Sequence, residues 1–332
     1  MKFLDELGLA DKIIFIIFAI CTIVGNTLVL VATWREASLH QPNKYFIASL
    51  AVADLLVGMI LDPVRVYYTK YDYESQHTLS FYPCRFVAWI DAFALAASIC
   101  TLTFISFDRY LKIRKPLQYR FRMTTSKSLK IIFIIWFISA AFATYAAIPD
   151  SGNNNELPCG TFDLDEMKRY YTLLAISAFF LPTAVMLVMY TLIFVVVHKR
   201  QKMMRNGELG QTCNDRNQRS AFLQDLKAIR MLLVVVGVFI LCWGPYCIFV
   251  LLVCYNPNHL IEPHSDLRRL YIADVVLNKL PYFNSLCNPI VYACMDQTYR
   301  AAFKNLFQRM CRSSSRRRQP PEAIELPPLR RR

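Results

Sequence analysis

The sequence has little of what a soluble protein of its size usually contains. Only 19% of its 332 residues are charged and only nine are glycine, whereas 55% are apolar. A soluble chain would carry more charge and spread it along its length. Here the charges lie between long apolar runs, which excludes an ordinary soluble domain and indicates an integral membrane protein.

Several chemical motifs are also missing. The eleven cysteines show no Cys-x-x-Cys pair and no metal-ligand spacing. The five histidines lie near the ends of apolar runs or between them, so they form no metal site for an enzyme inside the membrane. The inverted repeats and Gly-rich breaks of a transporter are absent too. We therefore expect neither an enzyme nor a transporter.

The net charge of +14 has two interpretations. Nucleic acid is one class of partner for such a basic chain, but the basic residues here lie beside the apolar runs. That position is typical of contact with anionic lipid and the cytosol. We expect membrane lipid as a partner and no nucleic acid.

Seven apolar stretches are long enough to cross the ~30 Å of hydrocarbon, which takes about 20 helical residues. Lipid offers the backbone no hydrogen-bond partners, so each must be helical. The prediction is an all-α membrane protein, a seven-transmembrane helix bundle. The first stretch is too long for a cleavable signal core, so we interpret it as an uncleaved signal anchor. The stretches cover residues 12–34, 43–69, 83–113, 128–148, 170–198, 228–254 and 270–293.

Charge between the spans predicts the orientation. Segment 109–130 is basic without a single acid. Segment 199–230 and the C-terminal tail are also strongly basic, whereas 150–169 is mainly acidic. Basic loops stay in the cytosol, so the N-terminus is expected outside and the C-terminus inside the plasma membrane. Cys84 and Cys159 then lie in polar segments on the oxidising side, where we expect a disulfide between them.

The segment after the seventh span predicts a short amphipathic helix. Residues 296–307 place Tyr299, Phe303 and Leu306 on one face, which suits the inner leaflet. Cys311 follows as a candidate palmitoylation site. We expect an extracellular N-terminus over 1–11, a seven-helix domain over 12–308 and a disordered cytoplasmic tail over 309–332.

Ionisable side chains inside a membrane are costly and need a reason. Asp54 lies midway along the second span, Asp91 in the outer half of the third, and Asp108 and Arg109 at its inner end. Asp91 and Arg109 are eighteen residues apart, which is five turns and about 27 Å on one helix face. The pattern predicts a ligand anchor outside and a partner contact inside. The alternative for Asp54 and Asp91 is a structural carboxylate bonded to nearby hydroxyls.

At this point the chain resembles the rhodopsin-like (class A) G-protein-coupled receptors along nearly its whole length. Seven motifs follow one another in order, one for each predicted span, and this order is far more specific than any single motif. They are Gly25-Asn26, Asp54, Asp108-Arg109-Tyr110, Trp136, Pro182 with Tyr190, Cys242-Trp243-Gly244-Pro245 and Asn288-Pro289-Ile290-Val291-Tyr292.

The resemblance implies a switch at the inner end of the bundle. Arg109 would pair with Asp108 and with Asp225 at the foot of the sixth helix, holding the third and sixth helices together at rest. Pro245 would make the sixth helix a lever that Trp243 moves. The alternative is that these aromatic residues only pack the core, but their position relative to Pro245 favours the functional interpretation.

Further positions take their implied roles from the same family. Tyr190 and Tyr292 would approach one another on activation, and Tyr110, Asn288 and Pro289 complete the switch motifs. Asp54, Ser98, Asn284, Ser285 and Asn288 resemble the family's sodium pocket, whose oxygen ligands suit a hard cation. No other cofactor is implied. A heterotrimeric G protein, an arrestin and a receptor kinase are the implied protein partners.

The ligand implied for this pocket is a small amine, because a carboxylate at the position of Asp91 resembles the aminergic receptors. A poorly solvated carboxylate attracts an ammonium strongly, and aromatic faces add cation–π attraction. The residues expected to bind the ligand are Asp91, Trp243, Tyr246, Tyr282, Phe179 and Asn278.

The chain departs from the aminergic pattern at several places. Cys247 replaces an aromatic residue, Lys279 stands where many relatives have tryptophan and could neutralise Asp91, and the fifth span lacks the serines that bind catechols. A simple biogenic, trace or imidazole amine suits the pocket better than a catechol. The alternative is a rhodopsin-like receptor for a small peptide, nucleoside or lipid with the same transduction mechanism.

Overall fold

The computed structural model describes residues 2–71, 81–147, 164–205, 213–256 and 272–317, and these residues are helical with short connections and no strand. The first half contains α1 (Lys2–Arg35), η1 (Ala37–Leu39), α2 (Pro42–Leu56), η2 (Val57–Leu61), α3 (Asp62–Tyr71), α4 (Phe81–Arg114), α5 (Pro116–Arg122) and α6 (Thr125–Ala147). The second half contains α7 (Leu164–Leu173), η3 (Leu174–Phe180), α8 (Leu181–Arg205), α9 (Cys213–Tyr255), α12 (Lys279–Met295) and α13 (Gln297–Arg317).

The helices form the predicted membrane bundle. Six spans in the described part of the chain are long and apolar enough to cross a membrane: 8–35, 42–67, 85–114, 125–147, 168–203 and 225–255. α12, preceded by a helical turn over 272–277, lies among them as the seventh. Large apolar side chains such as Phe133, Phe194 and Leu241 are about 70% exposed on the outside of the bundle. Such surfaces require lipid around them.

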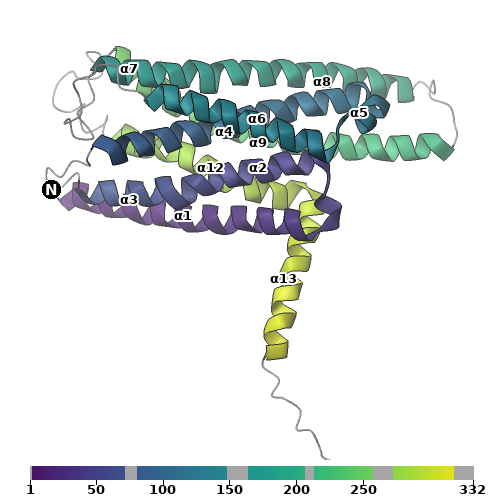
Figure 1. The fold of residues 1–332 in the computed structure, drawn as a ribbon, viewed down its shortest axis with the longest axis horizontal. Coiled ribbons are helices and arrows are strands. Elements are labelled where there is room, and N and C mark those ends of the chain that lie inside the picture. Colours follow the sequence, from purple (N-terminus) through teal and green to yellow (C-terminus); the bar gives the residue numbers. More distant parts are fainter. Residues whose placement is uncertain (1, 72–80, 148–163, 206–212, 257–271, 318–332) are drawn as a thin grey trace, which may run out of the picture.

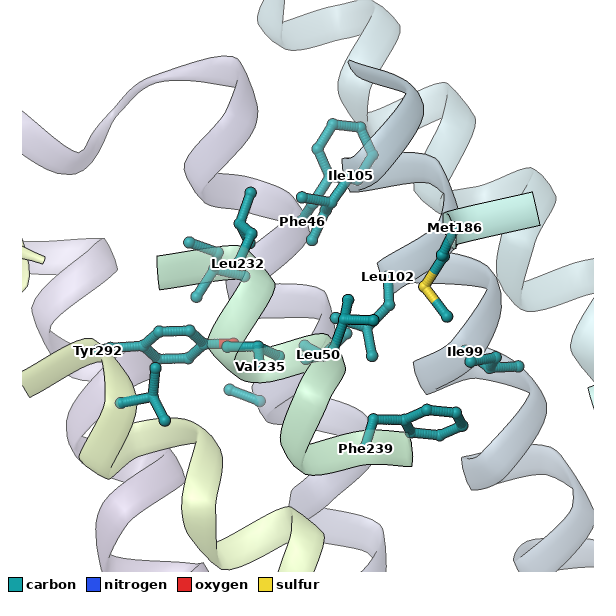
Figure 2. Packing of buried hydrophobic residues seen from close by; sticks show 14 of the residues in the cluster. Phe46, Leu50, Ile99, Leu102, Ile105, Met186, Leu232, Val235, Phe239 and Tyr292 are labelled. Atoms are coloured by element: carbon teal, nitrogen blue, oxygen red, sulfur yellow. The ribbon is translucent and has the colours of Figure 1, made fainter. Parts of the chain in front are cut away.

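α4 lies at the centre of the bundle. It packs against α2, α6 and α8, and 67% of its apolar part is buried, against 17% for the span 168–203. Figure 2 shows the core around it, where Ile99, Leu102 and Ile105 of α4 meet Phe46 of α2 and Phe239 of α9. Movement of α9 must therefore rearrange contacts with α4.

Polar side chains tie neighbouring helices together where water is absent. Trp136 Nε1 of α6 donates to Ser49 Oγ of α2 at 2.9 Å. Asn26 Nδ2 of α1 donates to the backbone oxygens of Thr22, 3.0 Å away, and of Ser285 in α12, 3.2 Å away. Each bond satisfies a buried polar group and also sets the rotation of its helix.

Among the described residues, π-helical turns occur in the second and the fifth spans. η2 joins α2 to α3, and η3 joins α7 to α8, each without a break in the helix. A π turn inserts a residue and changes which face of the helix the following residues occupy. Side chains beyond each turn therefore depart from a simple 3.6-residue spacing.

The helices extend beyond two of the expected segment boundaries. α1 begins at Lys2, so residues 2–11 are helical and continuous with the first span. α13 continues to Arg317, beyond the tail boundary expected at 309. In both segments the helix extends past the apolar stretch on which the expectation was based.

The bundle has two distinct ends. The N-terminal end of α1 lies at one end, which we call the outer end after the orientation expected from the sequence, and α5 and α13 lie at the other, which we call the inner end (Figure 1). Asp91 and Arg109, near opposite ends of α4, are therefore directed to opposite ends of the molecule, as their spacing predicted.

The close packing of α1 against α12 can be tested by substitution at Gly25. A Cβ added at Gly25 would lie 3.0 Å from Pro289 Cγ, and the proline ring cannot rotate away. We predict that Gly25→Ala lowers the apparent Tm of the detergent-purified protein by several degrees, measured by size-exclusion chromatography after heating. Gly237→Ala is the matched control, because a Cβ there meets no atom within 4 Å and alanine favours a helix by about 0.5–1 kcal/mol. Equal losses in both variants would contradict the packing argument.

Candidate functional site

A small cavity lies in the outer half of the bundle, between η2, α4, α9 and α12. Its volume is about 30 Å³, room for about two water molecules. Asp91, Trp243 and Tyr282 line it, as the sequence predicted. The other lining residues are Val57, Leu61, Ala94, Leu95, Ser98, Pro281, Asn284 and Ser285.

The other three expected ligand residues lie outside this wall. Tyr246 packs edge-to-face on Trp243, with ring centres 6.2 Å apart. Phe179 lies in η3 against Phe239, 5.8 Å between ring centres. Asn278 occupies the N-cap of α12. Tyr246 therefore supports the cavity through Trp243, whereas Phe179 belongs to the aromatic column below it.

Arg65 of α3 is a second charge at the outer end of this site. Its Nε donates to the Tyr282 hydroxyl at 2.8 Å, and its guanidinium carbon lies 5.7 Å from the centre of the Tyr282 ring. Arg65 lies within electrostatic range of Asp91 and Tyr246. It follows Leu61, a lining residue, by one helical turn, so it stands at the outer rim of the cavity.

Sequence reasoning did not select Arg65. The available signal was a charged residue inside the predicted second span, which is expensive unless it has a partner or a function. The direction of the Arg65 side chain could not be predicted from the sequence, because the π turn at Val57–Leu61 changes the helix face on which all later residues lie.

Lys279 does not neutralise Asp91, which corrects one expectation. Its ammonium forms an ion pair with Asp11 of α1 and donates to the backbone oxygen of Val275 at 2.6 Å. It also lies 5.9 Å from the centre of the Phe15 ring. The side chain therefore faces α1, and the carboxylate of Asp91 remains available to the cavity.

Below the cavity lies the carboxylate of Asp54, which is fully buried. Asn288 Nδ2 donates to its Oδ2 at 2.8 Å. Ser98, Asn284 and Ser285 line the cavity above it, and Asn284 Oδ1 is buried with no hydrogen-bond partner among the described residues. A carboxylate, an unpaired amide oxygen and hydroxyls in one place fit the requirements of a hard cation such as sodium.

At the inner end of α4, the ion pairs differ from those expected. Arg109 pairs with Asp108 at 2.8 Å, and the Tyr119 hydroxyl donates to the other oxygen of Asp108 at 2.7 Å. Burial, with the nearby charge of Asp108, raises the pKa of Tyr119. Asp225 of α9 pairs with Lys112 at 2.6 Å, not with Arg109. An ion pair therefore links α4 to α9 as expected, but it is formed by Lys112, one turn beyond Arg109 on α4.

The remaining switch residues lie around this end. The Tyr190 hydroxyl is buried without a hydrogen-bond partner in the described part of the chain, so it does not bond to Tyr292 in this conformation. Tyr292 instead stacks on Tyr299 of α13, with ring centres 5.7 Å apart. Tyr110 accepts a hydrogen bond from Arg114 at 2.9 Å. Pro289 lies inside α12.

α13 is anchored to the bundle by a buried ion pair. Asp296 bonds to Lys44 of α2, and its other oxygen caps the helix by accepting from the N–H groups of Thr298 at 2.8 Å and Tyr299 at 3.2 Å. The Tyr299 hydroxyl bonds to Thr33 Oγ1 of α1 at 2.9 Å. These contacts connect α13 with α1 and α2.

The structure does not describe the side chains of the three cysteines that have expected roles. Cys159 lies outside the described residues, and the side chains of Cys84 and Cys311 are not described either. The disulfide and the palmitoylation site therefore stay predictions. No cluster of three or more metal-ligating His, Cys, Asp or Glu residues occurs among the described residues.

Membrane-crossing helices, a charged cavity near one end and an arginine–carboxylate pair at the other are typical of a multi-pass membrane receptor. The chain belongs to the 7 transmembrane receptor (rhodopsin family), whose model matches residues 25–292. This family consists of receptors, not of enzymes, in agreement with the prediction from the sequence.

Individual relatives are similar at about 30% identity. Trace amine-associated receptor 5 of Mus musculus is 30% identical over 295 residues, which cover 87% of this chain and 82% of that receptor. Alpha-1D adrenergic receptor of Sus scrofa is 28% identical over 94% of this chain, and the match spans 59% of that receptor. Alpha-1A adrenergic receptor of Oryzias latipes is 28% identical over 90% of this chain and 66% of its own length.

The anchor of α13 can be tested by removing one charge. Asp296→Asn keeps an oxygen for the helix cap but leaves the Lys44 ammonium buried without its counter-charge, a change that costs about 3–5 kcal/mol in comparable buried pairs. We predict a lower apparent Tm in detergent. The double variant Lys44→Met, Asp296→Asn should recover much of the loss, because no charge then stays unpaired. A double variant no more stable than Asp296→Asn would contradict this account.

Proposed function

We propose that this chain is a plasma-membrane receptor that binds a small amine from the extracellular side and activates a heterotrimeric G protein. The main support for this proposal is that the carboxylate of Asp91 lies on the wall of a cavity that Trp243 and Tyr282 also line. Relatives named trace amine-associated and adrenergic receptors support it. A peptide, nucleoside or lipid ligand is not favoured, because the names of the similar receptors, trace amine-associated and adrenergic, are those of amine receptors.

The chemistry of the cavity suits an ammonium group. A carboxylate in a poorly hydrated site attracts a cation more strongly than water does, and the faces of Trp243 and Tyr282 add cation–π attraction. The cavity of about 30 Å³ has room for a group of ammonium size beside these side chains. A bound amine would contact Trp243, which connects the cavity to the core below.

An aromatic column runs from the cavity toward the inner end. Tyr246, Trp243 and Phe239 follow one another along α9, and the rings of Trp243 and Phe239 lie 6.3 Å apart. Phe239 is fully buried against α4 and η3. Displacement of Trp243 by the ligand would move α9 around Pro245. This movement would separate Asp225 from Lys112 and expose Arg109 to the G protein.

The remaining assignments belong to the same proposal. The N-terminus would lie outside, with the receptor domain over 12–308 and the tail from 309 inside, where arrestin, a receptor kinase and membrane lipid would bind. Cys84 and Cys159 would form an outer disulfide, and Cys311 would carry a palmitoyl group. A sodium ion on Asp54, Ser98, Asn284 and Ser285 would favour the resting state.

The amine assignment is tested with a panel of biogenic and trace amines on cells that express the chain. We predict signalling by at least one amine, and a loss of potency of at least about 100-fold in Asp91→Asn, because a neutral amide cannot replace the charge. Surface expression of both proteins is measured with an epitope tag. Equal potency of parent and variant would reject Asp91 as the anchor, whereas the family membership would stand.

The pair between α4 and α9 predicts a change in signalling without ligand. Asp225→Asn breaks a partly exposed ion pair worth at most about 1 kcal/mol, so basal signalling should rise about two- to fivefold. The charge exchange Lys112→Asp, Asp225→Lys should return it toward the parent level. Asp165→Asn serves as the control, because Asp165 is 84% exposed and pairs with Lys168 at the opposite end. A rise in the control, or no rise in Asp225→Asn, would contradict the proposed lock.

A further inference from the structure

Asp62, the first residue of α3, is a buried acid that the proposed mechanism does not use. Its exposed fraction is 0%, and neither of its side-chain oxygens has a hydrogen-bond partner in the described part of the chain. Two other buried aspartates are satisfied: Asp54 accepts a hydrogen bond from Asn288, and Asp108 pairs with Arg109. Contacts within the protein therefore do not support a negative charge at Asp62.

Asp62 lies on the face of its helix that packs against α1. It follows Gly58 by four residues, which is about one turn of the π helix η2, and a Cβ added at Gly58 would lie 3.0 Å from Thr22 of α1. Toward the outer end, the residues one and two turns before Thr22 are Phe18 and Phe15, which belong to one apolar cluster. The carboxyl group therefore lies at an apolar contact between α1 and α3.

This contact is connected to the ligand cavity. Phe15 packs edge-to-face on Tyr282, with ring centres 5.2 Å apart, and the Tyr282 hydroxyl lies within electrostatic range of Asp62. Leu61, the residue before Asp62, lines the cavity together with Tyr282. A change of charge at Asp62 would therefore disturb the packing of two residues on the cavity wall.

The charged groups of the surrounding helices do not neutralise a carboxylate at Asp62. On its own helix, Arg65 donates to a tyrosine hydroxyl of α12 and forms no hydrogen bond with Asp62. Between α1 and α12, Lys279 pairs with Asp11, and α4 presents another acid, Asp91, on the cavity wall. Since a carboxylate without hydrogen bonds is far more costly to bury than a neutral carboxyl group, this environment favours the protonated form.

We propose that Asp62 is a proton-binding site, protonated while α1, α3 and α12 are packed as described and ionised when these helices separate enough to hydrate it. Asp62 lies toward the outer end, so its proton would exchange with the extracellular side. The described conformation retains the pair between Lys112 and Asp225, which holds the receptor at rest in the proposed function. Acid outside the cell should therefore stabilise the resting receptor, and this last step rests on that function.

The proton site is tested first on the purified receptor in detergent, without any ligand. A carboxyl group that keeps its proton in the folded state and loses it on unfolding favours unfolding as the pH rises. The effect reaches tenfold in the unfolding equilibrium constant per pH unit and ends where Asp62 itself ionises. We predict that the apparent Tm falls by several degrees more from about pH 6 to about pH 8 in the parent than in Asp62→Leu.

Two neutral variants and one control make the comparison specific. Asp62→Leu places an apolar side chain of similar length in the apolar contact, and Asp62→Asn keeps the shape of the acid without its proton. Each is compared with itself across the pH range, so a uniform change in stability does not matter. Asp165→Asn is the control and should keep the pH dependence of the parent, because Asp165 is 84% exposed.

Infrared spectroscopy observes the proton directly. At neutral pH the parent should show a C=O stretching band of a protonated carboxyl group that is missing in Asp62→Asn and that disappears as the pH rises. Parallel Tm profiles of the parent and Asp62→Leu, or the same carboxyl band in the parent and Asp62→Asn, would overturn the proton site.

Basal signalling of cells at the same two external pH values tests the link to the resting state. The parent should signal at least about twofold less at the lower pH, whereas Asp62→Leu should keep a low value at both, after correction for surface expression. The same pH dependence in both proteins would overturn this link. None of these outcomes affects the amine assignment, which is tested separately through Asp91.

Discussion

The structure depends on the cost of placing charge in a medium that cannot solvate it. Every ionised side chain inside the bundle needs a partner, and the partners it finds determine how the helices are held. Lys44 bonds to Asp296, Lys279 to Asp11, Arg109 to Asp108 and Asp225 to Lys112. Three of these four pairs join helices far apart in the chain, so they fix the contacts of α1, α2, α4, α9, α12 and α13.

The same constraint separates structural charges from those that can act on a ligand. Lys279 has a carboxylate partner away from the cavity, so it contributes to the contact between α1 and α12. Asp91 lies on the cavity wall, and Arg65 donates a hydrogen bond to the Tyr282 hydroxyl. Charges of both signs therefore lie at this end of the bundle, whereas the Lys112–Asp225 pair at the inner end holds α4 to α9.

The sequence predicted the spans, the order of the motifs and the opposite directions of Asp91 and Arg109, because each depends only on helical geometry and the thickness of a membrane. It did not predict the partner of Asp225, because Arg109 and Lys112 lie one turn apart on the same face and both are within reach. It also did not identify Arg65, whose direction depends on the π turn of η2.

What the sequence by itself determined is that the chain crosses the membrane with helices and belongs among rhodopsin-like receptors, since apolar length and ordered motifs are local properties. Only the tertiary structure decided which charges meet. Helix rotation decides that Lys279 pairs with Asp11 and not with Asp91. It also decides that Asp225 pairs with Lys112 and not with Arg109, and it brings Arg65 near Asp91. That rotation is set by packing between residues distant in the chain, and no local pattern encodes it.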